Sequence, residues 1–318
     1  MADELVDRLD VAIDAVIARR DATATLRDPD LAPLVRIAAD LRHYPGAEFK
    51  ARLRAQLERR RTMTTAELTA NVREGFATVT PYVWVPDRGL ADFLIKTFDA
   101  VQTRVDEHGQ HGTHRELRVG DSMLMLGEDP RSGTVPGRRM AFHVFVDDVD
   151  AVFAKALAAG GESMGDPADR PYGERSGFIK DPYGNHWYIA TPLTPWSLKR
   201  ALRSVTPYLH AHDVRAYMGF LARAFGAVEE ELHEVSGGAI PYARSRIGDA
   251  AIEFGTHDPS PGAFFIYVSD PDAVYEQALT AGAKPLSPPA DQPSGIRIGF
   301  VEDPEGTHWY IARPAPVV

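Results

Sequence analysis

The chain contains a ten-residue segment that occurs twice, and this repetition constrains the fold more than any other feature. The two copies are Asp181-Pro-Tyr-Gly-Asn-His-Trp-Tyr-Ile-Ala190 and Asp303-Pro-Glu-Gly-Thr-His-Trp-Tyr-Ile-Ala312. Asp-Pro and Gly favour a tight turn, and the aromatic and β-branched residues that follow favour a strand. Alternate strand residues point to opposite faces, so we expect Trp187 and Trp309 in the core and Tyr188 and Tyr310 on the other face.

Other segments repeat at nearly the same spacing. Thr-Pro-Tyr-Val at 80–83 returns as Thr-Pro-Tyr-Leu at 206–209, and Arg118-Val-Gly-Asp121 returns as Arg246-Ile-Gly-Asp249. Such close internal similarity indicates a gene duplication. Each copy has the order strand, helix and three strands, followed by the same order again. We expect helices at 90–101, 149–159, 214–225 and 271–281, within an α+β fold.

Hydrophobic periodicity divides the chain into three parts. Residues 1–75 carry helical patterns at 4–20, 31–41 and 47–61, and they are predicted to form a helical leader. Residues 76–195 and 204–318 are the two copies, and 196–203 connects them. The leader is a candidate for contact with a protein partner or for self-association.

The repeated turn and strand also resemble a known family. DPxGNxxE-type endings close the last strand of vicinal oxygen chelate proteins, and the segments DPYGNHW and DPEGTHW are similar to them. That family includes glyoxalases, extradiol dioxygenases and bleomycin- or fosfomycin-resistance proteins. The resemblance implies two tandem glyoxalase-like domains made of paired βαβββ modules, which form cup-shaped half-barrels. The second copy looks most similar to the glyoxalase and bleomycin-resistance subgroup, whose members often lack the metal triad.

The resemblance also implies where metal ligands would stand, since three strands supply them in metal-using members. Those positions hold Thr80, Ala141 and Tyr188 in the first copy and Thr206, Ala263 and Tyr310 in the second. Alanine cannot bind a metal, and neutral Thr and Tyr are poor ligands. We therefore predict no resident metal and no other cofactor. A two-residue shift in register would instead make His143 a ligand, and His210 with His212 is a further candidate pair.

Without a metal, the predicted cups are lined mainly by aromatic residues, which suit a flat or apolar organic ligand. The predicted ligand-binding residues are Tyr82, Trp84, Tyr188, Tyr208, Phe265, Tyr267 and Tyr310. The alternative is that these rings simply fill the cups. His143 and His210 are the predicted catalytic residues, because a neutral histidine can act as a general acid or base without a metal.

Tandem relatives can exchange modules between copies, and the sequence leaves both arrangements open. Exchange would bring together the polar set His143, Tyr188, Tyr208 and His210. The other cup would then hold the aromatic set Tyr82, Trp84, Phe265, Tyr267 and Tyr310. Under exchange one cup is therefore polar and the other aromatic.

Composition narrows the classes of partner. The 318 residues include 35 basic and 45 acidic side chains, and the net charge of −10 argues against nucleic-acid binding. The lack of cysteine excludes disulfides, thiolate metal sites and a catalytic thiol. The acidic N-terminal segment has no apolar signal core, and no run reaches membrane-spanning length. We therefore expect a cytoplasmic protein without a membrane partner.

The leading functional prediction is metal-independent binding of a small aromatic or apolar molecule, as in resistance proteins that sequester a drug. The alternative is a metal-independent isomerase, cyclase or lyase that uses His143 and His210. A third hypothesis is a ligand-responsive regulator that acts through the helical leader. Fold resemblance alone does not choose among these, because one fold supports many functions.

Overall fold

The structure is a computed structural model that describes residues 72–73, 75–109, 112–131, 139–194, 202–258 and 261–314. All of these belong to one compact unit, Met63–Val318. The predicted helices of the leader lie outside the described residues. Within the described ranges, no helix is long and apolar enough to cross a membrane.

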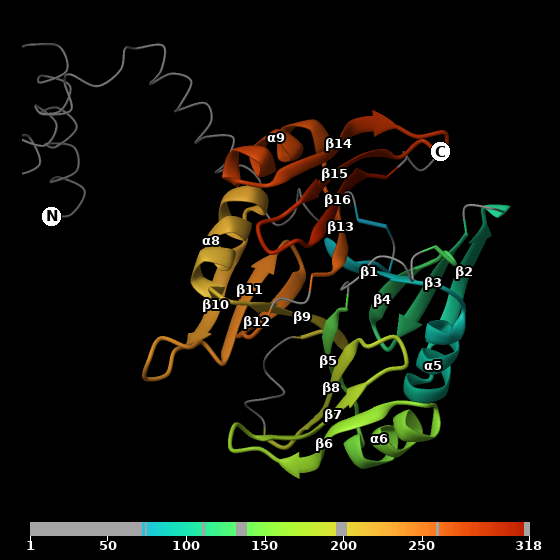
Figure 1. Ribbon diagram of the computed structural model, residues 1–318, viewed down its shortest axis with the longest axis vertical. Coiled ribbons are helices and arrows are strands. Elements are labelled where there is room, and N and C mark those ends of the chain that lie inside the picture. Colours follow the sequence, from blue (N-terminus) through green and yellow to red (C-terminus); the bar gives the residue numbers. More distant parts are fainter. Residues whose placement is uncertain are drawn as a thin grey trace, which may run out of the picture. The chain divides into compact units, whose positions relative to one another are not determined.

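Four modules of one strand, one helix and three strands follow one another along the chain (Figure 1). Module 1 comprises β1 (Val79–Val85), α5 (Gly89–Phe98), β2 (Val101–Glu107), β3 (Thr113–Val119) and β4 (Ser122–Glu128). Module 2 comprises β5 (Ala141–Phe145), α6 (Val149–Ala158), β6 (Glu162–Asp169), β7 (Glu174–Lys180) and β8 (His186–Pro192). Module 3 comprises β9 (Val205–Ala211), α8 (Val214–Phe225), β10 (Val228–His233), β11 (Tyr242–Ile247) and β12 (Ala250–Thr256). Module 4 comprises β13 (Ala263–Tyr267), α9 (Pro271–Ala281), β14 (Lys284–Asp291), β15 (Arg297–Glu302) and β16 (His308–Arg313). The predicted α+β order of paired βαβββ modules is confirmed.

Each sheet combines modules from both sequence copies. One eight-stranded sheet has the order β14-β15-β16-β13-β1-β4-β3-β2 and joins modules 1 and 4. The other has the order β10-β11-β12-β9-β5-β8-β7-β6 and joins modules 2 and 3. At the centre of each sheet the first strands of two modules run antiparallel, so that Thr80 faces Phe265 and Thr206 faces His143. The exchanged arrangement, which the sequence left open, is the one present.

The helices and the repeated tryptophans connect the two modules of one copy. Helix α5 packs against α6, and α8 packs against α9 (Figure 1). The ring centroid of Trp187 lies 5.2 Å from that of Phe98 at the end of α5. The ring centroid of Trp309 lies 4.6 Å from that of Phe225 at the end of α8. Both indoles are fully buried, which confirms their predicted core position. The sheets therefore join modules across copies, while the helices join them within a copy.

A reciprocal pair of aspartates fixes the strands of one copy to those of the other. Asp121 Oδ1 accepts a hydrogen bond from the backbone N–H of Ser204 at 2.7 Å, and Asp249 Oδ1 accepts one from the backbone N–H of Thr78 at 2.7 Å. The glycine before each aspartate has a positive φ, and a Cβ there would collide with the hydroxyl of the same Ser204 or Thr78. This contact explains why Gly-Asp occurs at both equivalent turns.

The aspartate that opens each repeated turn is a buried hydrogen-bond acceptor. The donors to Asp303 are the backbone N–H groups of Glu305 and Thr307, the indole N–H of Trp309 and the hydroxyl of Tyr217, at 2.6 to 2.9 Å. Asp181 has the same role, and the indole N–H of Trp187 is one of its donors. Each aspartate thus positions the last strand of its module, which carries Tyr188 or Tyr310.

We predict that Asp303→Ala lowers the free energy of unfolding by about 3 kcal/mol or more, because several buried donors lose their acceptor. Asp270→Ala is the matched control, since Asp270 only caps α9 through the backbone N–H of Ala273. Loss of such a cap costs about 1 kcal/mol. Urea denaturation measures both variants, and equal losses would show that the buried acceptor has no special role.

Candidate functional site

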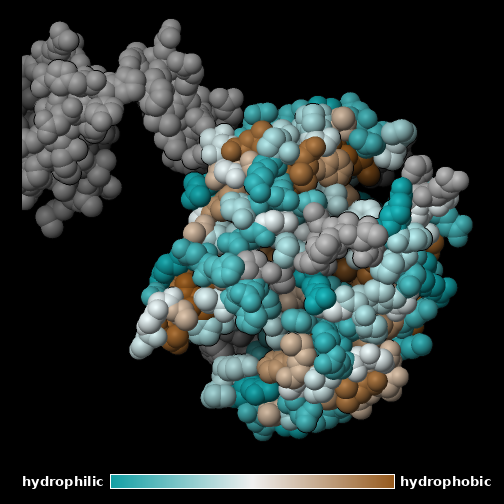
Figure 2. All heavy atoms as spheres, in the orientation of Figure 1, coloured by the Kyte–Doolittle hydropathy of each residue, from teal (hydrophilic) through white to brown (hydrophobic). Residues whose placement is uncertain are grey.

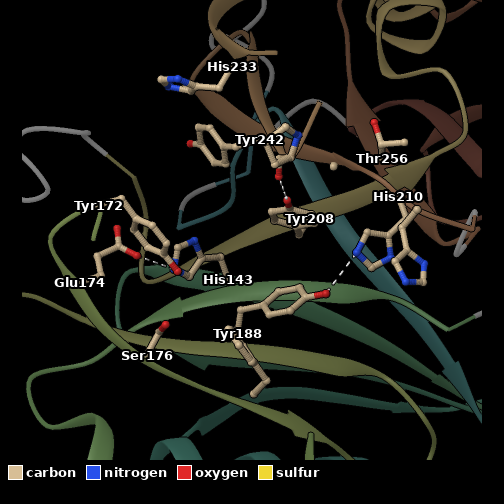
Figure 3. A pocket seen from close by; sticks show the side chains of 14 residues that line it. His143, Tyr172, Glu174, Ser176, Tyr188, Tyr208, His210, His233, Tyr242 and Thr256 are labelled. Carbon is tan, nitrogen blue, oxygen red and sulfur yellow. Dashed lines mark hydrogen bonds and ion pairs between the residues drawn. The ribbon is translucent and has the colours of Figure 1, made fainter. Parts of the chain in front are cut away.

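A cavity of about 500 Å³ lies on one face of the sheet formed by modules 2 and 3 (Figure 3). Strands of both modules line it, with polar side chains that include His143, Glu174, Ser176, Tyr188, Tyr208 and His210. We call this face the polar cup. A cavity of this size suits a small organic molecule.

The exposed apolar side chains, in contrast, are dispersed. Large examples are Val101 on β2, Met164 on β6, Val228 on β10 and Leu286 on β14. Figure 2 shows apolar residues in small separate groups among hydrophilic ones on the face that it draws. Single exposed apolar residues are normal on protein surfaces. The cavity is therefore the better candidate for a functional site.

His143 lies between two buried carboxylates at the floor of the polar cup. Its Nδ1 is 2.9 Å from Glu253 Oε2. Its Nε2 is 3.6 Å from Glu174 Oε2, and Figure 3 shows these two side chains. The side chains of Glu174 and Glu253 are 1% and 0% exposed. Tyr242 donates a hydrogen bond to the other oxygen of Glu253 at 2.8 Å. Glu253 therefore holds the imidazole ring in one orientation, with Nε2 directed towards Glu174.

Strand register decides which residue of β5 stands at the predicted ligand position. His143 lies directly beside Tyr188 of β8 and Thr206 of β9. Ala141, which we predicted for this position, instead faces Tyr208. The predicted register is therefore wrong by two residues. Ala141 and His143 still lie on the same face of β5, because alternate residues of a strand share a face.

The equivalent position in the other sheet shows the same shift. Phe265 of β13 faces Thr80 of β1 and Tyr310 of β16. Ala263, predicted for this position, lies beside His308. Neither residue can bind a metal, so the shift changes the expected chemistry only in the polar cup.

Tyr188 and His210 form a neutral polar pair in the polar cup. The Tyr188 hydroxyl lies 3.1 Å from His210 Nε2. Burial, together with the neighbouring His257 and His186, lowers the pKa of His210 to about 4. Burial also raises the pKa of Tyr188. Both groups are therefore neutral near pH 7, and the phenol can donate its proton to the imidazole nitrogen in a hydrogen bond.

Glu174, Glu253 and Tyr242 of the polar cup were not predicted from the sequence. A comparison of the two copies contained the signal for the two acids, because the equivalent positions hold Ile296 and Met125. Strand register confirms the second match, since Glu253 lies beside Tyr208 and Met125 lies beside Tyr82 in corresponding pairs. An acid that replaces an apolar residue at a buried strand position indicates a functional site, because burying an acid costs free energy.

The equivalent face of the other sheet, which we call the aromatic cup, contains the remaining predicted ligand-binding residues. Phe265 and Tyr310 are stacked with ring centroids 5.0 Å apart, and Tyr82 meets both edge-on at 5.4 and 5.5 Å. Trp84 donates a hydrogen bond to the hydroxyl of Tyr310 at 3.0 Å. Tyr267 lies in the same cluster. These rings pack on one another, so the contacts among them account for their burial.

The segment that precedes β1 also packs on the aromatic cup. Phe76 meets Tyr267 edge-on at 6.2 Å, and Arg73 makes hydrogen bonds of 2.6 and 3.0 Å to the two carboxylate oxygens of Glu116. Burial would raise the pKa of Glu116, but hydrogen bonds from His114 and Arg73 outweigh it and lower the pKa to about 2. Arg73, near the end of the predicted leader, and Phe76 thus pack against this core.

The polar cup combines imidazole, carboxyl and phenol side chains. Metal sites need several convergent imidazole, carboxylate or thiolate ligands. Burial raises the pKa of both Tyr188 and Tyr208, which keeps these neighbours of His143 and Glu253 as neutral phenols. Among the residues that the structure describes, no three His, Asp or Glu side chains are arranged to hold a metal ion.

Comparison with known proteins finds relatives of the same fold. The sequence profile described as Glyoxalase/Bleomycin resistance protein/Dioxygenase superfamily matches residues 90–189. Mb0911c of Mycobacterium bovis, an uncharacterized protein, is 34% identical over 128 residues, which are 36% of this chain and 83% of that protein. CFP32 of Mycobacterium tuberculosis, which is named as a candidate glyoxylase, is 32% identical over 187 residues, covering 55% of this chain and 69% of that protein.

A solved structure extends the likeness to both sequence copies. Glyoxalase I from Zea mays superposes with a TM-score of 0.58 and 17% identity, covering 74% of this chain and 92% of that chain. Likeness at this level of identity shows a shared fold and leaves the chemistry to the residues of the site.

We predict that stability falls as the pH decreases from about 6.5 to about 4, and that part of this loss disappears in His210→Phe. The ordinary pKa of histidine is 6.5, whereas that of His210 in the folded chain is about 4. In this pH range the unfolded chain therefore binds a proton at His210 that the folded chain does not bind. This difference lowers the free energy of unfolding by up to about 3 kcal/mol.

Urea denaturation near pH 7 and near pH 4.5 measures the difference, with His212→Phe as a control because His212 is exposed. Equal pH dependence in the parent and in His210→Phe would show that burial does not hold His210 neutral.

Proposed function

The chain belongs to the glyoxalase/bleomycin resistance protein/dioxygenase superfamily, and we propose that it binds a small organic molecule in the polar cup without a metal. The observation that carries this proposal is the asymmetry between two equivalent cups of one duplicated fold. The polar cup holds four polar residues where the aromatic cup holds apolar ones. The pairs are His143 with Phe265, Glu174 with Ile296, His210 with Trp84, and Glu253 with Met125.

Buried polar groups need a reason, because burying them costs free energy unless their hydrogen bonds are complete. The aromatic cup demonstrates that the same fold accommodates apolar residues at all four positions. Stability alone therefore does not require His143, Glu174, His210 and Glu253. Recognition of a ligand does, since pockets combine apolar walls with a few well-placed polar groups.

The cavity offers both kinds of surface to one ligand. Tyr172, Phe178 and Tyr242 supply apolar ring area, while Glu174 and the pair of Tyr188 and His210 supply polar contacts. The ligand that fits is a compact molecule with an apolar body and at least one polar group. Sequestration of such a molecule needs no further chemistry from the chain.

A second candidate is an enzyme of the isomerase, cyclase or lyase type, and the contact between His143 and Glu253 favours it. A buried carboxylate 2.9 Å from Nδ1 fixes the tautomer of the ring and stabilises its protonated form. Nε2 is then the nitrogen that exchanges a proton with a bound molecule. Tyr188 and His210 could steady charge that develops elsewhere on that molecule.

We predict that Ser176→Phe abolishes binding in the polar cup, because the larger side chain fills part of the cavity that Ser176 lines. The probe is the neutral fluorescent dye 1-aminoanthracene, whose emission rises in an apolar pocket. Ile298→Phe is the matched control, since Ile298 occupies the equivalent position in the aromatic cup. EDTA should leave binding unchanged. Equal binding by the parent and Ser176→Phe, or loss of binding in EDTA, would contradict the proposal.

The catalytic candidate predicts that His143→Phe and His210→Phe each reduce turnover by about 10²-fold or more, the usual effect of losing a general acid or base. Phe keeps a ring of similar bulk, and binding of 1-aminoanthracene should change much less. The substrate is a compound that the chain consumes from a cell extract, identified by mass spectrometry. Trp84→Phe in the aromatic cup is the control. Turnover at the parent rate in both histidine variants would leave sequestration as the function.

A further inference from the structure

We infer that the polar cup selects an organic cation, meaning an amine or ammonium group carried on an apolar body. This inference rests on the proposed function and specifies the class of ligand. Two independent features of the cavity lead to it, the sign of its charge and the nature of its walls.

The floor of the cavity contains carboxyl groups. Glu174 lines it, and Glu253 lies directly behind His143 at 2.9 Å. These two carboxyl groups flank the imidazole of His143 at the floor of the cavity. Among the described residues that line the cavity there is no lysine and no arginine. A cation therefore enters a favourable field, whereas an anion would be repelled.

The nearby arginines belong to other contacts. Arg170 donates hydrogen bonds to the carbonyl and the hydroxyl of Ser176 at 3.1 Å and covers the ring of Phe178 at 4.9 Å. Arg244 forms an ion pair with Glu230 at 2.9 Å. Neither arginine is among the described residues that line the cavity, although Arg170 contacts Ser176 and Phe178, which do line it.

The walls of the cavity are aromatic. Tyr172, Phe178, Tyr188, Tyr208 and Tyr242 all line it, and the rings of Tyr188 and Tyr208 are 5.2 Å apart (Figure 3). The faces of aromatic rings attract cations, and several such rings together form the usual cage for an ammonium group. A buried carboxylate beside aromatic walls recognises the charge and the apolar body of the same molecule.

The aromatic cup has neither the acid nor the tyrosine at the equivalent positions. Ser294 stands at the position of Tyr172, and Ile296 stands at the position of Glu174. Tyr172 is 48% exposed and sits at the turn between β6 and β7, so its ring borders the entrance. The duplicated fold has therefore placed an aromatic entrance and an acidic floor in the same cup.

Displacement of bound 1-aminoanthracene by three probes of similar shape tests the inference. The cation is benzyltrimethylammonium, the neutral isostere is neopentylbenzene, and the anion is phenylmethanesulfonate. We expect the cation to bind about tenfold more tightly than either of the others. Glu174→Gln should weaken the cation about tenfold and leave the neutral probe unchanged. Glu276→Gln on α9 is the control, because it removes an exposed carboxylate away from the cup.

The possible results separate this inference from the function on which it rests. If the neutral or anionic probe displaces the dye as well as the cation does, the cup binds ligands but does not select cations. If the dye itself does not bind, the proposed function fails as well. Should thermal melting show that Glu174→Gln is unfolded, Tyr172→Ser replaces it, since Tyr172 is half exposed and the other copy already has serine there. Unchanged preference for the cation in the folded variant would overturn the inference.

Discussion

The antiparallel pairing of first strands across the two sequence copies is the constraint on which the site depends. Because β5 pairs with β9, His143 comes to lie beside Thr206, and the cup receives Tyr208 and His210 from the other copy. Asp121 and Asp249 at the Gly-Asp turns stabilise the same pairing, because each accepts a backbone hydrogen bond from the segment that precedes the first strand of the other copy. The repeated motifs of the sequence are therefore mainly structural, and the chemistry lies at positions where the copies differ.

Duplication explains how one fold can hold two different cups. Pairing across copies gives each sheet one early and one late module, so the two cups draw on different halves of each copy. The aromatic cup packs its rings together and contributes to the core. The stability that this core contributes offsets the cost of four buried polar residues in the polar cup. Such residues lower stability unless they are well paired. An acidic floor and aromatic walls are a coherent set of features for recognising one class of molecule.

Much of the architecture could be predicted from the sequence because it depends on local patterns. The helices at 214–225 and 271–281 match α8 and α9, whereas the helix predicted at 90–101 ends at Phe98 because Asp99 adopts a left-handed conformation. The sequence also placed His143 and His210 in one cup if the modules were exchanged, but local patterns carry no information about which strands pair. The predicted register of β5 was wrong by two residues for the same reason. Periodicity shows which residues share a face of a strand, but it does not show which residue of the neighbouring strand each one lies beside. Glu253 was missed because it meets His143 only through the pairing of β5 with β9 across the copies. Glu174 was missed because β8 separates its strand, β7, from β5.

The most direct test of the account is a crystal structure of the chain with the small molecule that raises its melting temperature most in a compound screen. The account predicts electron density for that molecule between His143, Tyr188 and His210, with a positively charged group near Glu174. Density among Tyr82, Phe265 and Tyr310 instead, with the polar cup filled only by water, would contradict it.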